Sequence, residues 1–216
     1  MSGQGLAGCY AAGRIHQTLE KPRMTASPGV RDTRRMDLTV VSLRDGETLG
    51  DRFLKVNHAG EHGAVHIYAG QILMARVTAR SMLPALRDFK AHEEGHRAIF
   101  WGELQRRGRP RCRSYWPCAL GGVVLGLVTG LLGRRAIAAT TVAVERVVLT
   151  HLDAQVACLQ GNDEAAVSAI GAIVAEEREH CDAFADELGE GSLWVKLLTP
   201  VVAASTKTVI WLGLRL

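Results

Sequence analysis

The chain has 216 residues, which is enough for one domain with a sizeable core and short for two. Hydrophobic residues make up 47% of it but aromatic residues only 5%, and this composition, dominated by Ala, Leu and Val, favours helices over a β-sandwich. The formal charge is +4 without a long run of Lys or Arg beyond the first third, which argues against nucleic acid as the main partner and is compatible with an anionic membrane surface.

The N-terminal stretch differs in composition from the rest. Its first 36 residues are polar, rich in Arg and Gly, and contain only two acidic residues, Glu20 and Asp32. Mitochondrial transit segments, disordered tails and extensions upstream of a natural start at Met36 all share this composition. Because no amphipathic Arg-containing helix stands out, we interpret residues 1–48 as a disordered N-terminal tail or extension. Residues 49–216 then form the folded domain.

From about Leu49 onward the hydrophobic pattern is helical nearly throughout, and no segment alternates with the period of two that is typical of strands. Pro84 falls in a first helical turn, where proline is accepted, and Gly108 with Pro110 ends that helix. The pattern therefore predicts an all-α fold. Its six helical segments are 50–78, 82–107, 117–133, 134–160, 164–188 and 192–215.

The third and the last of these segments, 117–133 and 192–215, are the most apolar. The first of the two has 17 uncharged residues, whereas a helix needs roughly 20 to cross a bilayer. We therefore expect both helices to lie in the plane of a membrane surface, with burial inside the bundle or in a dimer interface as the alternative. Aromatic rings with one polar edge settle at such interfaces. The expected interfacial residues are Trp116, Trp194 and Trp211.

Two Glu-x-x-His motifs stand on predicted helices, one at Glu93–His96 and one at Glu177–His180. Residues three apart lie on one helical face, so each motif offers a carboxylate and an imidazole to one ion. In a helix rich in Glu, however, such a pair alone is usually part of a solvated face.

The spacing of further glutamates favours a metal site. Glu61 lies 32 residues before Glu93, and Glu145 lies 32 residues before Glu177, so the two halves of the chain repeat with an offset of 84. Ferritin-like di-iron and di-manganese bundles take one Glu from each of two helices and Glu-x-x-His from each of the other two. We therefore predict a ferritin-like four-helix bundle with an internal two-fold repeat and two additional apolar helices for membrane contact. The predicted metal ligands are Glu61, Glu93, His96, Glu145, Glu177 and His180.

The neighbours of these glutamates support a metal site. Glu145 ends the apolar run 141–144, where an unpaired buried charge would cost several kcal/mol, so a metal partner is the better interpretation. Glu61 is flanked by Gly60 and Gly63, each of which costs roughly 1 kcal/mol in a helix interior. These glycines predict either a close approach of helices or open space beside the metals.

The ligand types indicate which metal binds. Four carboxylates and two imidazoles without thiolates suit iron or manganese better than structural zinc. By ferritin-like precedent Glu93 and Glu177 bridge the two ions, while Glu61 and Glu145 bind one ion each. Outer partners should orient the imidazoles. The candidates for this role are Glu179, Asp182 and His151.

The five cysteines match neither a zinc site nor a disulfide framework, which indicates a reducing compartment. We expect Cys181, next to His180, to be a small buried helix residue.

Four segments carry a resemblance to a known family: HAGEHGA at 58–64, IYAGQ at 67–71, TVAVE at 141–145 and EREHCD at 177–182. Together they closely resemble the demethoxyubiquinone hydroxylases, from about residue 50 to the C-terminus. The resemblance implies a membrane-associated di-iron monooxygenase. Such an enzyme hydroxylates the ring of a polyprenylated methoxy-methyl-benzoquinol, the penultimate step toward ubiquinone.

For individual residues, the resemblance implies that the six predicted ligands bind two iron ions and that dioxygen is the co-substrate. It places Tyr68 near the iron site as a catalytic residue for electron or proton transfer, with helix packing as the alternative. Two positions depart from the familiar forms of the family, since Arg146 replaces an acidic residue and Leu152 replaces a tyrosine. This departure affects the pocket in the second half and leaves the ligand set intact.

The resemblance also implies a location and partners. We expect a peripheral protein on the cytoplasmic face of a bacterial inner membrane, or alternatively on the matrix face of the mitochondrial inner membrane. A homo-oligomer and a complex with a ubiquinone-biosynthesis partner protein both stay open. No glycine-rich dinucleotide fingerprint is present, so electrons come from a docked donor, from transient NADH binding or from the quinone itself.

Three alternative functions compete with the hydroxylase: iron storage or detoxification, another ferritin-like quinol oxidase, and a scaffold that keeps the metal site but acts through a partner. The long apolar segments argue against storage, because a soluble ferritin shell has little use for them.

Overall fold

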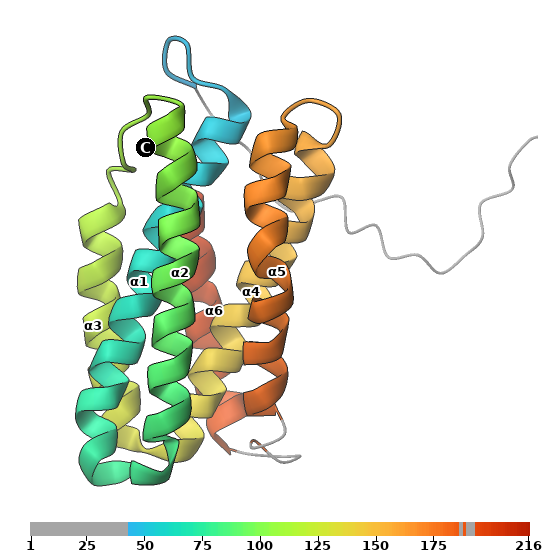
Figure 1. The fold of residues 1–216 in the computed structure, drawn as a ribbon. Helices are drawn as coiled ribbons and strands as arrows, with labels where there is room; N and C mark the ends of the chain where they lie inside the picture. The colour runs from blue at the N-terminus through green and yellow to red at the C-terminus, as the bar shows by residue number, and fades with distance from the viewer. Residues whose placement is uncertain (1–42, 186–187, 189–192) are drawn as a thin grey trace, which may run out of the picture. The chain divides into compact units, whose positions relative to one another are not determined.

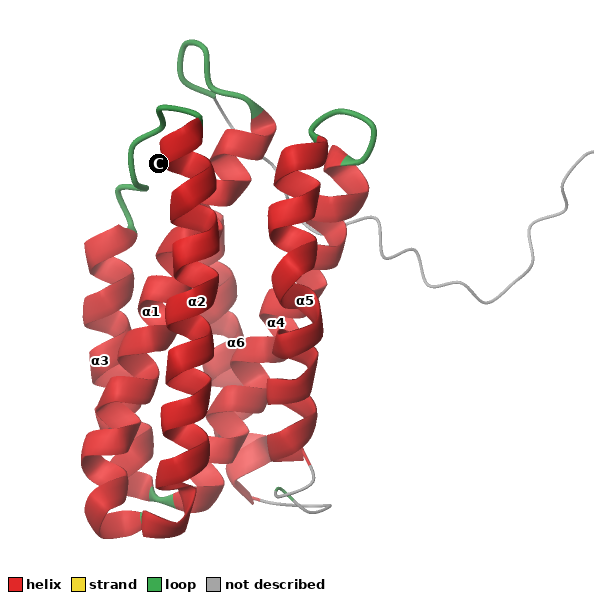
Figure 2. Cartoon of the chain, in the orientation of Figure 1, coloured by secondary structure: helices red, strands yellow, loops and turns green. Residues whose placement is uncertain are grey.

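The computed structural model describes residues 43–185, 188 and 193–216. Within these ranges the chain forms six α-helices and one short 3-10 helix, and it has no strand (Figure 1; Figure 2). The all-α prediction is confirmed, and the predicted helix boundaries agree to within a few residues wherever the chain is described. The elements are α1 (Leu49–Thr78), η1 (Arg80–Met82), α2 (Leu83–Arg106), α3 (Tyr115–Leu132), α4 (Arg134–Leu159), α5 (Glu164–Ala185) and α6 (Leu193–Gly213).

The predicted N-terminal tail lies mostly outside the described residues, which begin at residue 43. Its last residues contact the first helix. Thr48 is the N-cap of α1: its hydroxyl oxygen accepts a hydrogen bond from the Asp51 backbone N–H, and Asp51 accepts one from the Thr48 backbone N–H. This reciprocal arrangement satisfies two backbone donors that a helix start otherwise leaves unpaired.

The same pattern of helix packing occurs twice. α1 packs most extensively against α3 and α2, and α4 packs most extensively against α5 and α6 (Figure 1). In each half, therefore, the first helix contacts the two that follow it. Further contacts of α2 with α5 and of α3 with α4 join the halves. The packing thus follows the order of the sequence repeat and extends it to the apolar helices α3 and α6.

The predicted ligands lie between two clusters of buried apolar side chains. On each of α1, α2, α4 and α5, one cluster occupies one end of the helix, the other cluster occupies the opposite end, and the ligands stand between them. Apolar packing on both sides fixes the spacing of the four helices around a polar layer. One cluster includes Tyr68, Leu86, Ile137 and Phe184. The other includes Phe53, Phe100, Leu152 and Ile170.

Glycines bring α1 and α3 into close contact. A Cβ atom added to Gly122 would collide with the carbonyl oxygen of Gly63, and one added to Gly126 would collide with the carbonyl oxygen of Ile67. The obstacles are backbone atoms, which cannot move aside as a flexible side chain can. The prediction of close helix approach is therefore confirmed for Gly63.

Two helices are long and apolar enough to cross a membrane by length and composition alone, namely Tyr115–Leu132 of α3 and Trp194–Gly213 of α6. Only 6% of the α6 segment is buried, compared with 39% of the α3 segment. Burial inside the bundle, the predicted alternative, therefore does not describe α6. Among the predicted interfacial residues, Trp116 and Trp211 are exposed, whereas Trp194 packs against the apolar cluster at the Tyr68 end.

A buried ion cluster precedes α1. The carboxylate of Glu47 accepts hydrogen bonds from Arg52 at 2.7 Å and from Lys55 at 2.8 Å. Burial alone would raise the pKa of Glu47, but its bonds to Arg52 and Lys55 outweigh burial and lower that pKa to about 2. Because this value lies below the ordinary 4.5, the cluster stabilises the fold fully above pH 4.5 and loses that contribution as the pH falls toward 2.

We predict that Glu47→Gln lowers the free energy of unfolding by about 2–3 kcal/mol at pH 7, because it removes the buried charge that accepts hydrogen bonds from two buried cations. Urea unfolding at pH 7 and at pH 3 measures this, and the difference from wild type should shrink at the lower pH. The control is Glu94→Gln, which removes an exposed partner of Lys90 and should cost less than about 1 kcal/mol. Equal losses for the two variants would contradict the prediction.

Candidate metal centre

The structure brings all six predicted ligands together in the polar layer, and each is at most 5% exposed. They form two overlapping groups, and in each group the nearest ligand atoms all lie within 4.8 Å of one another. Glu93 and Glu177 belong to both groups, which is the arrangement that bridging carboxylates require. The first group adds Glu61 and His96, and the second adds Glu145 and His180.

Four carboxyl groups in one buried layer perturb one another strongly. Burial raises the pKa values of Glu61 and Glu145 well above their usual range, and the charges of Glu93 and Glu177 raise them further. Burial also favours the neutral form of Glu93, but contacts with His180 and His96 outweigh it and lower its pKa to about 2. The pKa of His96 rises to about 10, because contacts with Glu177 and Glu93 overcome the opposing effect of burial. The cluster therefore favours positive charge at its centre.

Ring nitrogens and carboxylate oxygens of the cluster point toward one another, but several of them have no hydrogen-bond partner among the described residues. Nδ1 of His96 lies 3.0 Å from a Glu177 oxygen, and Nδ1 of His180 lies 3.4 Å from a Glu93 oxygen. Even so, both Nδ1 atoms, Oε1 of Glu93 and Oε2 of Glu177 are buried without a hydrogen-bond partner in the described chain. Leaving such atoms unpaired is costly, and two metal ions would use these lone pairs. The residues thus fit a two-metal centre of the kind that iron or manganese prefers.

The two imidazoles have outer partners that the sequence analysis missed. Nε2 of His96 lies 2.9 Å from Oε2 of Glu176, and Nε2 of His180 lies 2.9 Å from Nδ1 of His92. Each partner immediately precedes the glutamate of a Glu-x-x-His motif, and the two share the offset of 84. That position in the repeat is the signal that could have identified them.

The outer partners that we predicted do not fill this role. Glu179 and Asp182 are exposed, and neither contacts an imidazole of the cluster in the described chain. Both lie on the outward side of α5, whereas Glu176 lies closer to the neighbouring helix. The third candidate, His151, instead lines the cavity described below, and its Nδ1 is buried without a hydrogen-bond partner among the described residues.

Tyr68 lies beside the cluster. Its buried hydroxyl donates a long hydrogen bond of 3.4 Å to Glu145, and its ring meets Phe89 edge-on. Burial raises the pKa of Tyr68 well above 10, and the nearby glutamates, Glu145 first, raise it further, so the phenol keeps its proton at neutral pH. Tyr68 does not line the cavity. Its predicted part in electron or proton transfer stays a prediction.

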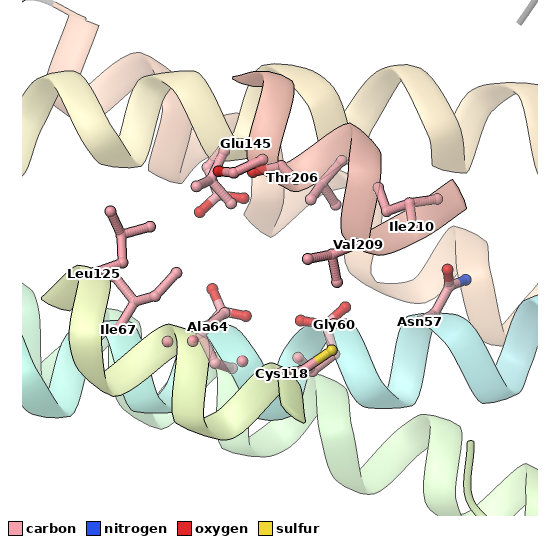
Figure 3. A pocket seen from close by; sticks show the side chains of 18 of the residues that line it. Asn57, Gly60, Ala64, Ile67, Cys118, Leu125, Glu145, Thr206, Val209 and Ile210 are labelled. Carbon is pink, nitrogen blue, oxygen red and sulfur yellow. The ribbon is translucent and has the colours of Figure 1, made fainter. Parts of the chain in front are cut away.

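A cavity of about 740 Å³ reaches the cluster from between α1, α3, α4 and α6 (Figure 3). Figure 3 shows Ala64 and Ile67 of α1 facing Glu145 of α4 and Val209 of α6 across it. Four glutamates of the cluster line one part of the cavity, and its other walls are mainly apolar. Its volume lies in the usual range of ligand pockets. The cavity can therefore hold an apolar molecule against the cluster.

The cavity opens between α3 and α6. Leu120 and Val124 of α3 and Val201 of α6 line it, yet each is more than half exposed. Gly60 also lines it, and a Cβ atom added there would meet nothing within 4 Å. At Gly60 the structure thus has the predicted open space, beside the cluster of predicted ligands.

Of the two positions that depart from the familiar family pattern, only Leu152 alters the cavity. It is buried and lines the wall, whereas Arg146 is exposed on α4. The four cysteines in the described residues are free, and Cys181 is buried as predicted.

Comparison with known proteins places the chain among similar sequences. Residues 48–213 match the family described as "Ubiquinone biosynthesis protein COQ7". The 3-demethoxyubiquinol 3-hydroxylase of Rhodospirillum rubrum is 38% identical over 170 residues, which cover 76% of this chain and 77% of the relative. The mitochondrial NADPH-dependent 3-demethoxyubiquinone 3-hydroxylase of Dictyostelium discoideum is 34% identical over 76% of each chain. The human enzyme of the same name is 32% identical over 97% of this chain and 99% of the relative.

Proposed function

Since the chain belongs to the COQ7 family of ubiquinone biosynthesis proteins, we propose that it hydroxylates 3-demethoxyubiquinol at a di-iron centre held by its six buried ligands. The observation that carries the proposal is an apolar cavity that ends at two overlapping groups of carboxylates and imidazoles. Family membership favours this activity over iron storage and over another quinol oxidase. Residues 49–216 then form a ferritin-like hydroxylase domain with an internal two-fold repeat.

The ligands divide between the two metal positions as their grouping suggests. Glu93 and Glu177, which belong to both groups, would be shared by the two ions; Glu61 and His96 would complete one position, and Glu145 and His180 the other. Iron bound by these residues would supply the redox chemistry that activates dioxygen for insertion into the ring. The protein contributes fixed ligands, and Tyr68 holds Glu145 in place through its hydroxyl.

The cavity positions the quinol. The ring lies at the inner end, against the glutamates, and the buried Nδ1 of His151 in the cavity wall offers a polar contact. The polyprenyl tail follows the apolar walls and leaves between α3 and α6. Apolar side chains on both sides exclude water from the ring, which protects the oxidising chemistry from side reactions.

The exposed apolar surface of α3 and α6 supports a location at a membrane surface. Because the tail dissolves in lipid, the cavity mouth and these helices must meet the bilayer together. The relatives are bacterial and mitochondrial proteins, so the cytoplasmic face of a bacterial inner membrane and the matrix face of the mitochondrial inner membrane both fit. For the reductant, the sequence left a docked donor, NADH and the quinone itself open. The names of several relatives specify NADPH, and we propose NADPH for this chain.

The proposal is tested by measuring quinones by mass spectrometry in cells that lack this gene. We expect the demethoxy precursor to accumulate, and reintroduction of the wild-type gene to restore ubiquinone. Normal ubiquinone without the precursor in the deleted cells would contradict the assignment.

A second prediction concerns the cavity. Gly60→Leu should raise KM for a short-tailed demethoxyubiquinol by at least about tenfold, which is ~1.4 kcal/mol, because its side chain enters the space meant for the ring. Metal content should stay at two ions per chain. Gly171→Leu, at an exposed position on α5 where an added Cβ atom meets nothing within 4 Å, is the control and should leave KM unchanged. An unchanged KM in Gly60→Leu would place the ring elsewhere.

A further inference from the structure

The outer partners of the two imidazoles are arranged alike but differ in chemistry. Oε2 of Glu176 and Nδ1 of His92 each lie 2.9 Å from Nε2 of a ligand histidine. The rings of His92 and His180 are almost parallel, at an interplanar angle of 7° with centroids 5.2 Å apart. Both contacts run between α2 and α5, so each partner serves the imidazole of the other half of the repeat.

The direction of each proton follows from the orientation of the rings. In both ligand histidines Nδ1 faces the carboxylates, and Nε2 faces the outer partner. A metal bound at Nδ1 leaves the proton of a neutral imidazole on Nε2, which must therefore donate. Glu176 accepts with a carboxylate oxygen. His92 accepts with the lone pair of Nδ1 and so carries its own proton on Nε2.

These two acceptors affect their imidazoles differently. A hydrogen bond to an ionised carboxylate is roughly twice as strong as one between neutral groups. A carboxylate partner also increases the basicity of a metal-bound imidazole, which strengthens its bond to the metal. His96 has such a partner, although the Glu176 side chain is 48% exposed and partly screened by water. The partner of His180 is an imidazole nitrogen and not a carboxylate.

We propose that Glu176 and His92 are positioning residues that make the two metal positions unequal. The position of His96 and Glu61 binds its ion more tightly and favours the ferric state more than the position of His180 and Glu145 does. The inference rests on the proposed function in one respect, namely that the six ligands hold two metal ions.

The test is anaerobic titration of the metal-free protein with Fe(II), followed by Mössbauer spectroscopy of protein loaded with ⁵⁷Fe. Wild type should show a tighter and a weaker site. Glu176→Gln should weaken the tighter site by about 10–100-fold, the usual effect of losing an outer partner. His92→Glu should strengthen the weaker site and change the spectrum of one iron of the pair. Both residues are exposed, so neither substitution opens the core.

The control variant is Glu179→Gln, which removes an exposed carboxylate of the same helix that contacts neither imidazole in the described chain. It should bind iron as wild type does. If wild type binds two ions and Glu176→Gln and His92→Glu both match the control in affinity and spectrum, the inequality is refuted while the di-iron proposal stands. If wild type binds no pair of ions, both proposals fail. Thermal unfolding of each metal-free variant identifies any loss that arises from misfolding.

Discussion

A Glu145→Gln variant is expected to fold normally and to lose at least about a thousandfold in hydroxylation rate, an increase of ~4 kcal/mol in the barrier. Glutamine has the size of glutamate but lacks the charge that holds a metal ion. Glu145 is one of only two ligands, with His180, that belong to the second group alone. Its loss should therefore empty or weaken that position, and the demethoxy precursor should accumulate in cells that carry this variant.

Although Glu145→Gln should lower the hydroxylation rate, it should raise the stability of the metal-free protein at neutral and higher pH. The pKa of Glu145 is raised in the folded state, so its favourable contribution is present below about pH 4.5 and is lost as the pH rises toward the raised value. Glutamine does not titrate. Without metal, the variant should therefore be more stable than wild type at pH 8 and similar to it at pH 4, as measured by urea unfolding.

Added Fe(II) should stabilise wild type more than it stabilises Glu145→Gln. A ligand at 100 times its Kd stabilises a fold by about 2.7 kcal/mol, so anaerobic Fe(II) should raise the Tm of wild type by several degrees and that of Glu145→Gln by less. Arg146→Gln, at the exposed neighbouring position, is the control and should behave as wild type does. Full hydroxylation by Glu145→Gln would remove Glu145 from the ligand set.

Gly126→Leu is expected to cost about 5 kcal/mol or more, which is comparable to the whole stability of many domains. The added side chain would push against the backbone of Ile67 and force α1 away from α3. Because α1 carries Glu61 and also packs against α2, separation of α1 from α3 disturbs the metal layer as well. Circular dichroism and urea unfolding in detergent would measure the loss.

The matched control lies on the same helix. Gly121→Leu places the same side chain at an exposed position where an added Cβ atom meets nothing within 4 Å, and it replaces a residue that weakens helices by about 1 kcal/mol. This variant should be as stable as wild type or slightly more so. Equal stability of both variants would show that α1 and α3 do not need glycine at their contact.

The sequence predicted the helices because they depend on local periodicity, and it predicted the six clustered residues because the two halves of the chain repeat. An offset of 84 between Glu61 and Glu145, repeated in both Glu-x-x-His motifs, placed all the ligands on the inner faces of four helices. The sequence left two explanations for Gly60 and Gly63, close helix packing and open space. The structure shows close packing at Gly63 and open space at Gly60.

The outer partners could not be predicted in the same way. Which carboxylate reaches Nε2 of His96 depends on how α5 is rotated against α2, and a rotation of a fraction of a turn separates Glu176 from Glu179. Likewise, His92 stands on the exposed side of its helix and resembles an ordinary surface residue. The cavity could not be predicted from the sequence either, because it arises from the angle between helices and not from any one segment.

The mouth of the cavity between α3 and α6 has a consequence for substrate choice. Its lining at that end consists of exposed side chains such as Leu120 and Val201, so nothing in the described chain closes over the far end of a prenyl tail. Such an enzyme recognises the ring of its substrate and does not select for the length of the tail, which continues into the lipid. One protein of this kind should therefore serve organisms whose quinones carry tails of different lengths, and transfer of its gene between them should restore the host's own quinone.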